Sequence, residues 1–385
     1  MSISITKQVP TKEQELIDLK KLRQKTINVF VFGHGNVGGL LIDQILDSQG
    51  HLASRRALDL RIVAIANSQT LVFNSNGIQG DWRTLKKQQG IAYTMQDILQ
   101  RVTDFGLYNL VAIDNTASPS FVLNYLPLVS GGFNLVSSNK IANTLTIDFY
   151  KNLRELLAKK GKTYLYETNV GAGLPLIDTI KLLHQSGENI TKINGIFSGS
   201  LSYVFNRYSE SDASFDSVLE EAVILGLTEP DPREDLSGSD VGRKLLIVAR
   251  ELDLHNEFEE VQIQNLIPKP LQSVSAHKFL LSLPELNPEF SAIKQKQQPD
   301  HVLRYVGSLT GNLFDSRGAN LKVSLESVPK NSMLGQVSGS DSMFEIFTES
   351  YGDRPIVIQG AGAGAAVTAR GVFGDVLRIA AQVKA

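Results

Sequence analysis

Ile27-Asn28-Val29-Phe30-Val31-Phe32 leads directly into Gly33-His34-Gly35-Asn36-Val37-Gly38, and this stretch decides the fold. The first half is a short apolar run, rich in β-branched and aromatic residues, which predicts a buried strand. Helical periodicity follows from Gly38 to Leu46, so the glycines lie at a strand-to-helix turn. There Gly33 permits the tight bend, Gly35 lets the backbone approach a pyrophosphate, and Gly38 lets helix and strand pack closely. The turn predicts a dinucleotide site at a helix N-terminus, with a purely structural glycine turn as the alternative.

Strands alternate with helices through the first half of the chain. The sequence predicts strands at Leu60–Ala66, Leu110–Ile113 and Asn134–Ser137, and a helix that contains Leu153–Ala158. This alternation is typical of right-handed βαβ units and a parallel sheet. We therefore expect an N-terminal arm over residues 1–26 and a Rossmann dinucleotide-binding domain over residues 27–165.

The pattern changes after about Tyr164. The predicted helices are Pro175–Gln185, Asp216–Leu225 and Ser239–Leu252, and the predicted strands are Ile193–Phe197, Val302–Leu309, Leu321–Ser327, Met343–Thr348 and Pro355–Gln359. Little helix separates the last strands, which favours an α+β substrate-binding domain with a mixed sheet over residues 166–359. A second glycine-rich turn, Gly360–Gly364, then leads into a helix that ends at Gln382, and residues 360–385 are expected to complete the first domain. The expected fold class is α/β.

The composition limits the chemistry available to these 385 residues. A net charge of −2 gives no reason to expect nucleic acid or an anionic membrane as a partner. No apolar run approaches the roughly 18 residues that span a bilayer, and the polar N-terminus lacks the apolar core of a secretory signal, so a soluble cytoplasmic protein is expected. The chain has no cysteine, which excludes a thiolate nucleophile and thiolate-bound zinc. Oxidation through a cysteine thioester is thereby excluded, and a hydride-transferring enzyme would interconvert a carbonyl and an alcohol.

The end of the second predicted strand, Ala66-Asn67-Ser68, bears on the choice of cofactor. An acidic residue here binds the adenosine 2′-hydroxyl of NAD, whereas a nearby arginine accepts the 2′-phosphate of NADP. Because no carboxylate is present to repel the phosphate, NADP is permitted, with Arg55 and Arg56 as candidate partners. We expect NADP to be favoured over NAD.

Lysines and carboxylates are the candidate catalytic groups. No tyrosine has a lysine four residues on, which excludes the Tyr-x-x-x-Lys of short-chain dehydrogenases, and the six histidines offer no pair at metal-ligand spacing. Lys140 follows a predicted strand, at the edge where ligands of doubly wound sheets bind. Asp240 and Lys244 lie four apart on one helix face, after the stiff acidic loop Leu227–Ser239. A lysine desolvated beside this aspartate can donate a proton to a substrate oxygen; a solvated loop with a surface ion pair is the alternative.

A glutamate followed by a glycine-rich turn occurs in Tyr166-Glu167-Thr168-Asn169-Val170-Gly171-Ala172-Gly173-Leu174-Pro175. Such a turn exposes backbone carbonyls, which can ligate a hard cation such as Na⁺. A plain turn into the next helix is the alternative, and the spacing alone favours it.

Taken together, these segments resemble homoserine dehydrogenases from about Ile27 to the C-terminus. The motifs that carry the resemblance are GHGNVG (33–38), DNTAS (114–118), SNK (138–140), ETNVGAGLP (167–175), GIFSGSLSYVFN (195–206), LTEPDPREDLSGSDVGRKLL (227–246), LIPKPL (266–271) and IQGAGAGAAVTARGVFGD (358–375). The stretch DLRIVAIANSQ (59–69) is particularly similar to the dehydrogenase half of bifunctional aspartokinase–homoserine dehydrogenases. We expect neither a kinase half nor a C-terminal regulatory ACT-type domain in this chain.

The resemblance implies reversible reduction of L-aspartate 4-semialdehyde to L-homoserine, on the route to threonine, methionine and isoleucine. The residues that it implies for cofactor contacts are Gly33, Gly35, Asn36, Val37, Gly38, Thr116, Lys140 and Gly364. The ligands that it implies for a structural sodium ion are Glu167 and the carbonyls of Val170, Ala172 and Leu174. It also implies a homodimer formed through the central sheet, so residues 166–359 would serve dimerisation as well as substrate binding.

The catalytic roles come from the same resemblance. It implies that Glu229, Asp235 and Asp240 hold the amino acid, since carboxylates suit its ammonium group. Lys244 would be the general acid in aldehyde reduction and the base in reverse, with Lys140 nearby as a second cation.

Three positions depart from the family pattern. Leu227 stands where the family usually has tyrosine, and His34 is unusual between the first two glycines. Gly242 replaces a usual alanine inside the catalytic helix, at a cost in helix propensity of about 1 kcal/mol. Every ionisable group that the chemistry needs is nevertheless present. Two alternatives stay open, namely an inactive nucleotide-binding regulatory protein and a reductase of a different small semialdehyde.

Overall fold

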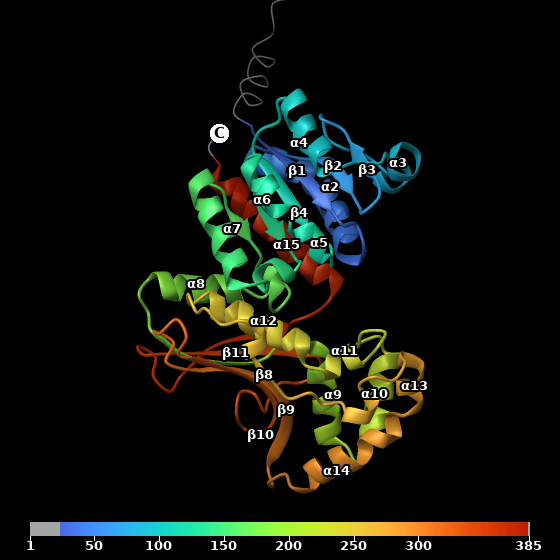
Figure 1. Cartoon of the computed structure of the whole chain (residues 1–385), viewed down its shortest axis with the longest axis vertical. Coiled ribbons are helices and arrows are strands. Elements are labelled where there is room, and N and C mark those ends of the chain that lie inside the picture. Colours follow the sequence, from blue (N-terminus) through green and yellow to red (C-terminus); the bar gives the residue numbers. More distant parts are fainter. Residues whose placement is uncertain (1–23, 384–385) are drawn as a thin grey trace, which may run out of the picture.

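The computed structural model describes residues 24–383, which form two six-stranded sheets and the helices around them (Figure 1). The predicted N-terminal arm lies mostly outside the described residues. Its last two residues, Lys25 and Thr26, belong instead to strand β1 (Lys25–Phe32), because they pair with the start of β2 (Leu58–Ala66). The first strand therefore begins at Lys25 and not at Ile27.

The first sheet has the order β3-β2-β1-β4-β5-β6, which is the Rossmann order. Strands β4 (Leu110–Asp114), β5 (Phe133–Ser137) and β6 (Tyr164–Leu165) extend it parallel to β1. Among the described strands of this sheet, only the short edge strand β3 (Leu71–Phe73) is antiparallel. The predicted parallel sheet is thus confirmed, and the carboxyl end of β1 lies where the strand order reverses, the usual place for a ligand.

Helices cover both faces of this sheet because alternate side chains of β1 point to opposite faces. Val29 and Val31 pack with the helices α2 (Asn36–Arg56) and α15 (Ala365–Gln382). Phe30 and Phe32 lie in the other core, beside residues of the helices on the opposite face. The remaining helices of this part are α3 (Trp82–Gln89), α4 (Met95–Asp104), α5 (Pro119–Val122), α6 (Tyr125–Ser130) and α7 (Ile147–Lys160).

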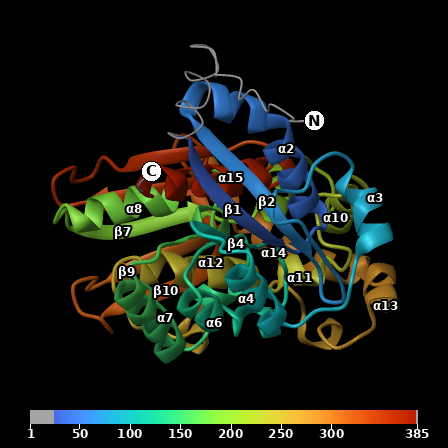
Figure 2. The ribbon, with the colours of Figure 1, turned by 90° about the horizontal axis from the view of Figure 1, so that it is seen from above.

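The C-terminal helix α15 returns to the first sheet. Figure 2 shows it beside β1, although the two come from opposite ends of the chain. The Lys25 ammonium donates to the carbonyl oxygen of Ala380 at 2.9 Å, and apolar side chains of α15 such as Val372 and Val376 join the core that contains β1. After β12, the last strand of the second sheet, the chain therefore returns to the first sheet, and α15 packs against it.

The second sheet has the order β12-β11-β7-β9-β10-β8 and is mixed, as predicted. Its strands are β7 (Ile190–Ile196), β8 (Gln262–Ile263), β9 (His301–Gly311), β10 (Ala319–Pro329), β11 (Asp341–Thr348) and β12 (Ile356–Ala361). Its neighbouring strands are antiparallel, except that β10 and β8 are parallel. The helices of this part are α8 (Leu176–Gln185), α9 (Gly199–Glu210), α10 (Phe215–Ile224), α11 (Arg233–Leu236), α12 (Ser239–Arg250), α13 (Ala276–Leu281) and α14 (Asn287–Gln295).

Short 3-10 turns complete the described secondary structure. They are η1 (Ile141–Asn143), η2 (Glu167–Asn169), η3 (Phe258–Glu260), η4 (Lys269–Leu271) and η5 (Leu283–Leu286). None of the helices in residues 24–383 has the length and apolar character that crossing a membrane requires.

Helix α12 lies between the two sheets (Figure 1) and packs on β9 and β10. It starts after Gly238, whose φ of 72° is left-handed, and a Cβ at Gly238 would lie 2.0 Å from the Tyr305 hydroxyl. A Cβ at Gly242 would lie 2.5 Å from the Cδ1 of Ile263 and 3.3 Å from the ring of Phe258. The glycine that departs from the family pattern therefore allows close packing of α12 on β8 and η3, which offsets its low helix propensity.

Candidate active site

Two cavities flank the glycine turn that follows β1. The smaller, of about 560 Å³, is lined by Gly33 and Gly35 together with the loops after β2 and β4. The larger, of about 770 Å³, is lined by Asn36 and Val37 and extends between the two sheets to α12. A ligand that passes over the glycine turn would enter both cavities, which suits an elongated molecule such as a dinucleotide.

The geometry of the turn explains its glycines. Gly33 has a φ of 84°, and a Cβ there would lie 2.8 Å from the Asn115 carbonyl. A Cβ at Gly38 would lie 2.0 Å from the carbonyl oxygen of Gly33. Gly35, in contrast, faces open space, with no atom within 4 Å of the place of a Cβ. Helix α2 begins there without a side-chain cap or an acidic residue in its first turn, so its N-terminus can accept an anionic ligand.

Asp114, at the end of β4, connects the loops that border the two cavities. Its carboxylate accepts hydrogen bonds from the Thr116 N–H (2.8 Å), the Tyr125 hydroxyl (2.8 Å) and the Asn139 amide (3.0 Å). Burial raises the pKa of Asp114, although these donors favour the charged form. Thr116 lines the smaller cavity and Lys140, next to Asn139, lines the larger. One buried carboxylate therefore sets the relative position of two predicted cofactor contacts.

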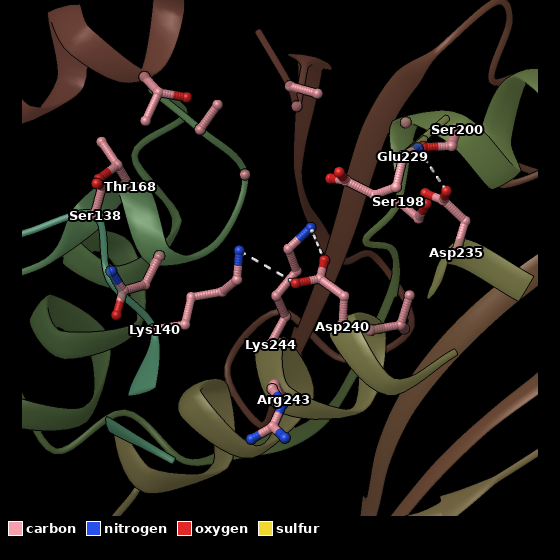
Figure 3. A pocket seen from close by; sticks show the side chains of 18 of the residues that line it. Ser138, Lys140, Thr168, Ser198, Ser200, Glu229, Asp235, Asp240, Arg243 and Lys244 are labelled. Atoms are coloured by element: carbon pink, nitrogen blue, oxygen red, sulfur yellow. Dashed lines mark hydrogen bonds and ion pairs between the residues drawn. The ribbon is translucent and has the colours of Figure 1, made fainter. Parts of the chain in front are cut away.

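Three predicted catalytic groups meet in the larger cavity (Figure 3). The Lys244 ammonium lies 2.8 Å from one oxygen of Asp240, and the Lys140 ammonium lies 3.1 Å from the other. Desolvation would raise the pKa of Asp240, but the two ammonium groups outweigh it and hold that pKa well below its usual range. The i,i+4 ion pair considered from the sequence is present, with the Asp240 side chain 47% exposed. It also borders the larger cavity and includes a second lysine from another part of the chain.

Two contacts fix the Lys244 ammonium and leave one of its N–H donors for a ligand. Its ammonium also donates to the carbonyl oxygen of Phe197 at 2.7 Å, and only 12% of its side chain is exposed. An ammonium has three N–H donors. Asp240 and Phe197 occupy two of them, which leaves one for an oxygen in the cavity.

The acidic loop before α12 supplies two more cavity groups. The backbone N–H of Glu229 donates to Asp235 at 2.9 Å, and both residues line the larger cavity (Figure 3). Desolvation raises the pKa of Asp235, and hydrogen bonds from Glu229 and Ser200 counteract part of this shift. Two carboxylates at this end of the cavity make it a suitable place for an ammonium group.

Several cavity residues are not among those predicted from the sequence. Among them are Ser138, Thr168, Ser198, Ser200, Arg243 and Thr368. Ser198 caps α9 by accepting a hydrogen bond from the Leu201 N–H, so the N-terminus of α9 points into the cavity beside Ser200. The serine before the helical run Gly199–Asn206 is a capping signal that a closer reading of the sequence could have used.

The glycine-rich turn after β6 lies only partly at this site. Ala172 lines the larger cavity, and so does the predicted cofactor residue Gly364 at the start of α15. Glu167 is buried and directed away, since its carboxylate accepts hydrogen bonds from the N–H groups of Ile177 (2.7 Å) and Asp178 (3.0 Å) in α8. No cluster of three histidine, aspartate or glutamate side chains in residues 24–383 could hold a metal. A cation at this turn would have to depend on backbone carbonyls.

Asn67 follows β2, at the place where Rossmann folds distinguish NAD from NADP, and it lines the smaller cavity. The side-chain oxygen of Asn67 accepts hydrogen bonds from the N–H groups of Gln69 (2.9 Å) and Thr70 (2.7 Å), which fixes a tight turn after β2. His34 lines the same cavity, and desolvation lowers its pKa. The prediction that Arg55 and Arg56 assist a 2′-phosphate is wrong. They end the 21-residue helix α2, roughly 30 Å along its axis from the glycine turn.

The fold and the site define an oxidoreductase class in which a Rossmann glycine turn opens onto a cavity with paired lysines and carboxylates. Residues 33–167 match the family profile described as homoserine dehydrogenase, NAD binding domain, and residues 175–377 match the profile described as homoserine dehydrogenase. The chain belongs to the homoserine dehydrogenase family. The resemblance inferred from the motifs is therefore confirmed.

Individual relatives agree with this assignment. The chain is 40% identical over 365 residues to bifunctional aspartokinase/homoserine dehydrogenase 1, chloroplastic, of Arabidopsis thaliana, over 93% of this chain but 39% of the relative. It is 35% identical over 370 residues to the homoserine dehydrogenase of Schizosaccharomyces pombe, over 93% of this chain and 96% of the relative. A hyperthermophilic archaeal homoserine dehydrogenase in complex with NADPH superposes with a TM-score of 0.69 at 20% identity, over 93% of this chain and 99% of that chain, which shows a shared fold. The chain thus spans about two fifths of the bifunctional relative.

Proposed function

We propose that the chain catalyses the reversible reduction of L-aspartate 4-semialdehyde to L-homoserine with a nicotinamide cofactor. One observation carries the proposal: Asp240 is held between Lys140 and Lys244 in a cavity that begins at the glycine turn. The same cavity holds carboxylates for an ammonium group at its other side. A small amino acid with a reactive oxygen fits this arrangement.

The residues present fit a dinucleotide. The glycine turn, with Asn36 and Val37, would hold its phosphates at the N-terminus of α2, and Thr116 would border its adenosine side. Lys140 and Gly364 line the larger cavity, where the nicotinamide would lie. When bound, the cofactor supplies the hydride that the carbonyl carbon accepts. We propose on this basis that residues 27–165 and 360–385 serve the cofactor and residues 166–359 the substrate.

The chain's own residues then handle the amino acid and the proton. Glu229 and Asp235 would bind the substrate ammonium, and the N-terminus of α9 at Ser200 faces the cavity where a carboxylate could bind. In reduction the carbonyl oxygen gains a proton, which the third N–H of Lys244 donates. The neutral amine is then reprotonated from solvent. In oxidation Lys244 first loses a proton to solvent and its neutral amine then accepts the hydroxyl proton, so the net reaction releases one proton.

The test is NADP⁺ reduction that depends on L-homoserine, measured with purified wild type and with Lys244→Ala. We expect Lys244→Ala to lose about 100- to 10,000-fold in kcat, the usual contribution of a general acid–base group, and to keep its cofactor affinity. Lys322→Ala is a matched control, because Lys322 lies 3.1 Å from Glu326 in a half-exposed ion pair and does not line the larger cavity. A wild type that binds cofactor but turns over no faster than Lys244→Ala is an inactive nucleotide-binding protein. Turnover of a different semialdehyde alone would indicate another reductase.

We propose that NADP is preferred over NAD. The support is the lack of a carboxylate at the end of β2, where Asn67 and Ser68 line the smaller cavity. Comparison of kcat/KM for NADPH and NADH tests this. A tenfold advantage of NADH would contradict it.

We propose further that the turn after β6 binds a structural sodium ion. Within the described residues, no hydrogen bond reaches the carbonyl oxygens of Val170 and Ala172, whereas that of Leu174 accepts one from the Leu176 N–H at 2.9 Å. Glu167, already bonded to α8, would contribute from behind this turn. Thermal unfolding in sodium chloride and in choline chloride of equal ionic strength tests the site. A midpoint that is the same in both salts would contradict it.

We propose a homodimer formed through the second sheet. The support is the edge strand β12, where Val357 is 38% exposed. On the face opposite α9 and α12, in contrast, Ile196, Val306 and Met343 are already buried by the segment that contains Leu334 and Val337. Light scattering after size exclusion measures the mass. A mass of one chain at micromolar concentration would overturn the proposal.

A further inference from the structure

Arg250, the last residue of α12, makes an unusual set of buried contacts. Arg250 is 1% exposed, so its guanidinium charge is removed from water and needs polar partners inside the protein. Its Nη1 donates to the carbonyl oxygens of Asn143 (2.9 Å) and Leu145 (2.7 Å). Its Nη2 donates to Oε2 of Glu257 at 3.0 Å. The guanidinium thus ties the end of α12 to the segment that follows β5.

That segment begins at Lys140. Lys140 caps the turn η1, and its carbonyl oxygen accepts a hydrogen bond from the Asn143 N–H at 3.2 Å. The segment then enters α7, where the N–H of Ile147 donates to Oε1 of Glu257 at 2.8 Å. Glu257 therefore bonds Arg250 with one oxygen and α7 with the other. Both carbonyls that Arg250 binds lie within five residues of Lys140 in the chain.

The other end of the same helix carries the proton-transfer groups. Asp240 and Lys244 precede Arg250 on α12 by roughly 15 and 9 Å along the helix axis, at 1.5 Å per residue. A helix transmits position along its length, so a contact that fixes Arg250 against the Lys140 segment also fixes Asp240 and Lys244 against Lys140. Tyr150 of α7 adds to this contact, since its hydroxyl donates to the Arg250 carbonyl at 3.2 Å.

We propose that Arg250 is a positioning residue, which holds the Lys140 turn at a fixed distance from Asp240 and Lys244 across the boundary between the two sheets. The inference rests on the proposed function and adds a residue that does not line the cavity. A contribution to stability alone does not explain a buried arginine here, because apolar side chains can often replace a buried ion pair with little loss in the free energy of unfolding. Lysine is not equivalent, since only the planar guanidinium fork reaches two carbonyls and a carboxylate together.

Arg304 provides a matched control. It is also 1% exposed, and its guanidinium donates to the carbonyl oxygens of Leu334 (3.0 Å), Gly335 (2.8 Å) and Val337 (3.1 Å). These contacts lie within the second sheet and its covering segment, away from Lys140. Removal of either guanidinium leaves buried carbonyls unpaired, so both variants carry a similar penalty in stability.

The experiment compares Arg250→Met, Arg304→Met and wild type in homoserine oxidation, at a temperature where circular dichroism shows all three folded. We expect Arg250→Met to lose about 100-fold in kcat, the scale of a 1 Å misplacement, with a smaller rise in KM for NADP⁺ because Lys140 is also a proposed cofactor contact. The deuterium isotope effect on kcat, with homoserine labelled at its carbinol carbon, should increase, because hydride transfer then limits turnover in place of product release. Arg304→Met should keep the wild-type kcat and isotope effect.

Equal losses of kcat in both variants, or an unchanged isotope effect in Arg250→Met, would overturn the inference. If Arg250→Met does not fold, Glu257→Gln takes its place, because its side chain is 31% exposed and the amide can still accept from Ile147. Glu257→Gln should then show the same rise in isotope effect with a smaller loss of kcat, and a wild-type isotope effect would contradict the inference. A wild type without homoserine oxidation refutes the proposed function itself, which separates the two failures.

Discussion

The Lys244 ammonium lies 2.8 Å from Oδ2 of Asp240, one helical turn earlier on α12. The other oxygen of the same carboxylate lies 3.1 Å from the Lys140 ammonium, which comes from the opposite side of the cavity. One negative charge thus keeps two positive charges close together. Without it the two ammonium groups would repel each other at the place where a substrate oxygen is proposed to bind.

Asp240→Asn is expected to separate the two lysines. The amide keeps the shape of the carboxylate but loses the charge, so kcat should fall about 100-fold, within the range for disrupted acid–base catalysis. Because the two ammonium groups hold the pKa of Asp240 well below its usual range, the wild type should show no loss of kcat from this group between pH 5 and 9. Initial rates of homoserine oxidation across this pH range measure both effects.

Glu326→Gln is the matched control for this change. Glu326 pairs with Lys322 at 3.1 Å, its side chain is 42% exposed and it does not line the larger cavity, so neutralising it should leave kcat as in wild type. A comparable loss in both variants would mean that Asp240 acts only through the overall charge of the protein.

Gly38→Ala tests the glycine turn. A Cβ at this position would lie 2.0 Å from the carbonyl oxygen of Gly33, which is backbone and can move only if the turn opens. We expect a loss of about 1–3 kcal/mol in the free energy of unfolding, as for overpacked sites, and weakened cofactor binding. Gly50→Ala in the same helix meets no atom within 4 Å and should gain up to about 1 kcal/mol. Urea unfolding measures the free energy of unfolding of both variants. Equal changes in the two would show that the turn tolerates a side chain.

The sequence predicts most of this site because its groups lie in recognisable local contexts. Lys140 is the third residue after a strand, and Asp240 and Lys244 share a helix face, so their meeting at a sheet edge follows from general rules of α/β folds. The order of motifs adds Glu229 and Asp235. The parallel sheet and the return of α15 follow from alternation and from the second glycine turn.

Other features depend on contacts that no local pattern contains. Arg250 lies in an apolar run, and its carbonyl partners come from a segment over a hundred positions earlier. Helix α3 is polar, with Trp82 as its only buried residue, so it shows no apolar face. Helix α4, in contrast, carries a capping box at Thr94 and Asp97 that makes its start predictable.

In buffer without sodium, the ion that Glu167 is proposed to ligate, the buried carboxylate of Glu167 should make stability depend on pH. Burial, and then the neighbouring Asp178, raise the pKa of Glu167 to about 8. Because the folded state then holds a proton that the unfolded state releases, stability is highest below the ordinary carboxyl pKa and falls as pH rises towards 8. In Glu167→Gln this fall should be smaller by up to about 1.4 kcal/mol per pH unit, the value for one proton.

The measurement is urea unfolding between pH 5 and 8.5. Glu188→Gln is the control, because a hydrogen bond from the Ser350 N–H lowers the pKa of that carboxyl. Its effect on stability should therefore be constant over this range. A Glu167→Gln variant with the slope of wild type would show that Glu167 is ionised in the folded protein.

Asn67→Asp tests the cofactor proposal with a single charge. The side-chain oxygen of Asn67 accepts hydrogen bonds from Gln69 and Thr70, and an aspartate offers the same acceptor, so the turn after β2 should be preserved. The added charge would repel a 2′-phosphate and accept from a 2′-hydroxyl. We expect kcat/KM for NADPH to fall about tenfold and that for NADH to rise, since 1.4 kcal/mol of repulsion corresponds to a factor of ten.

Asn74→Asp shows whether this effect depends on position. Asn74 makes the same kind of turn, with its side-chain oxygen accepting from the Asn76 N–H at 3.0 Å, but it does not line the smaller cavity. Asn74→Asp should therefore leave the ratio of kcat/KM for NADPH to that for NADH unchanged. If both variants shift the ratio equally, the net charge of the domain decides the preference. If neither does, the 2′-phosphate binds away from Asn67, and the missing carboxylate at the end of β2 explains nothing about NADP.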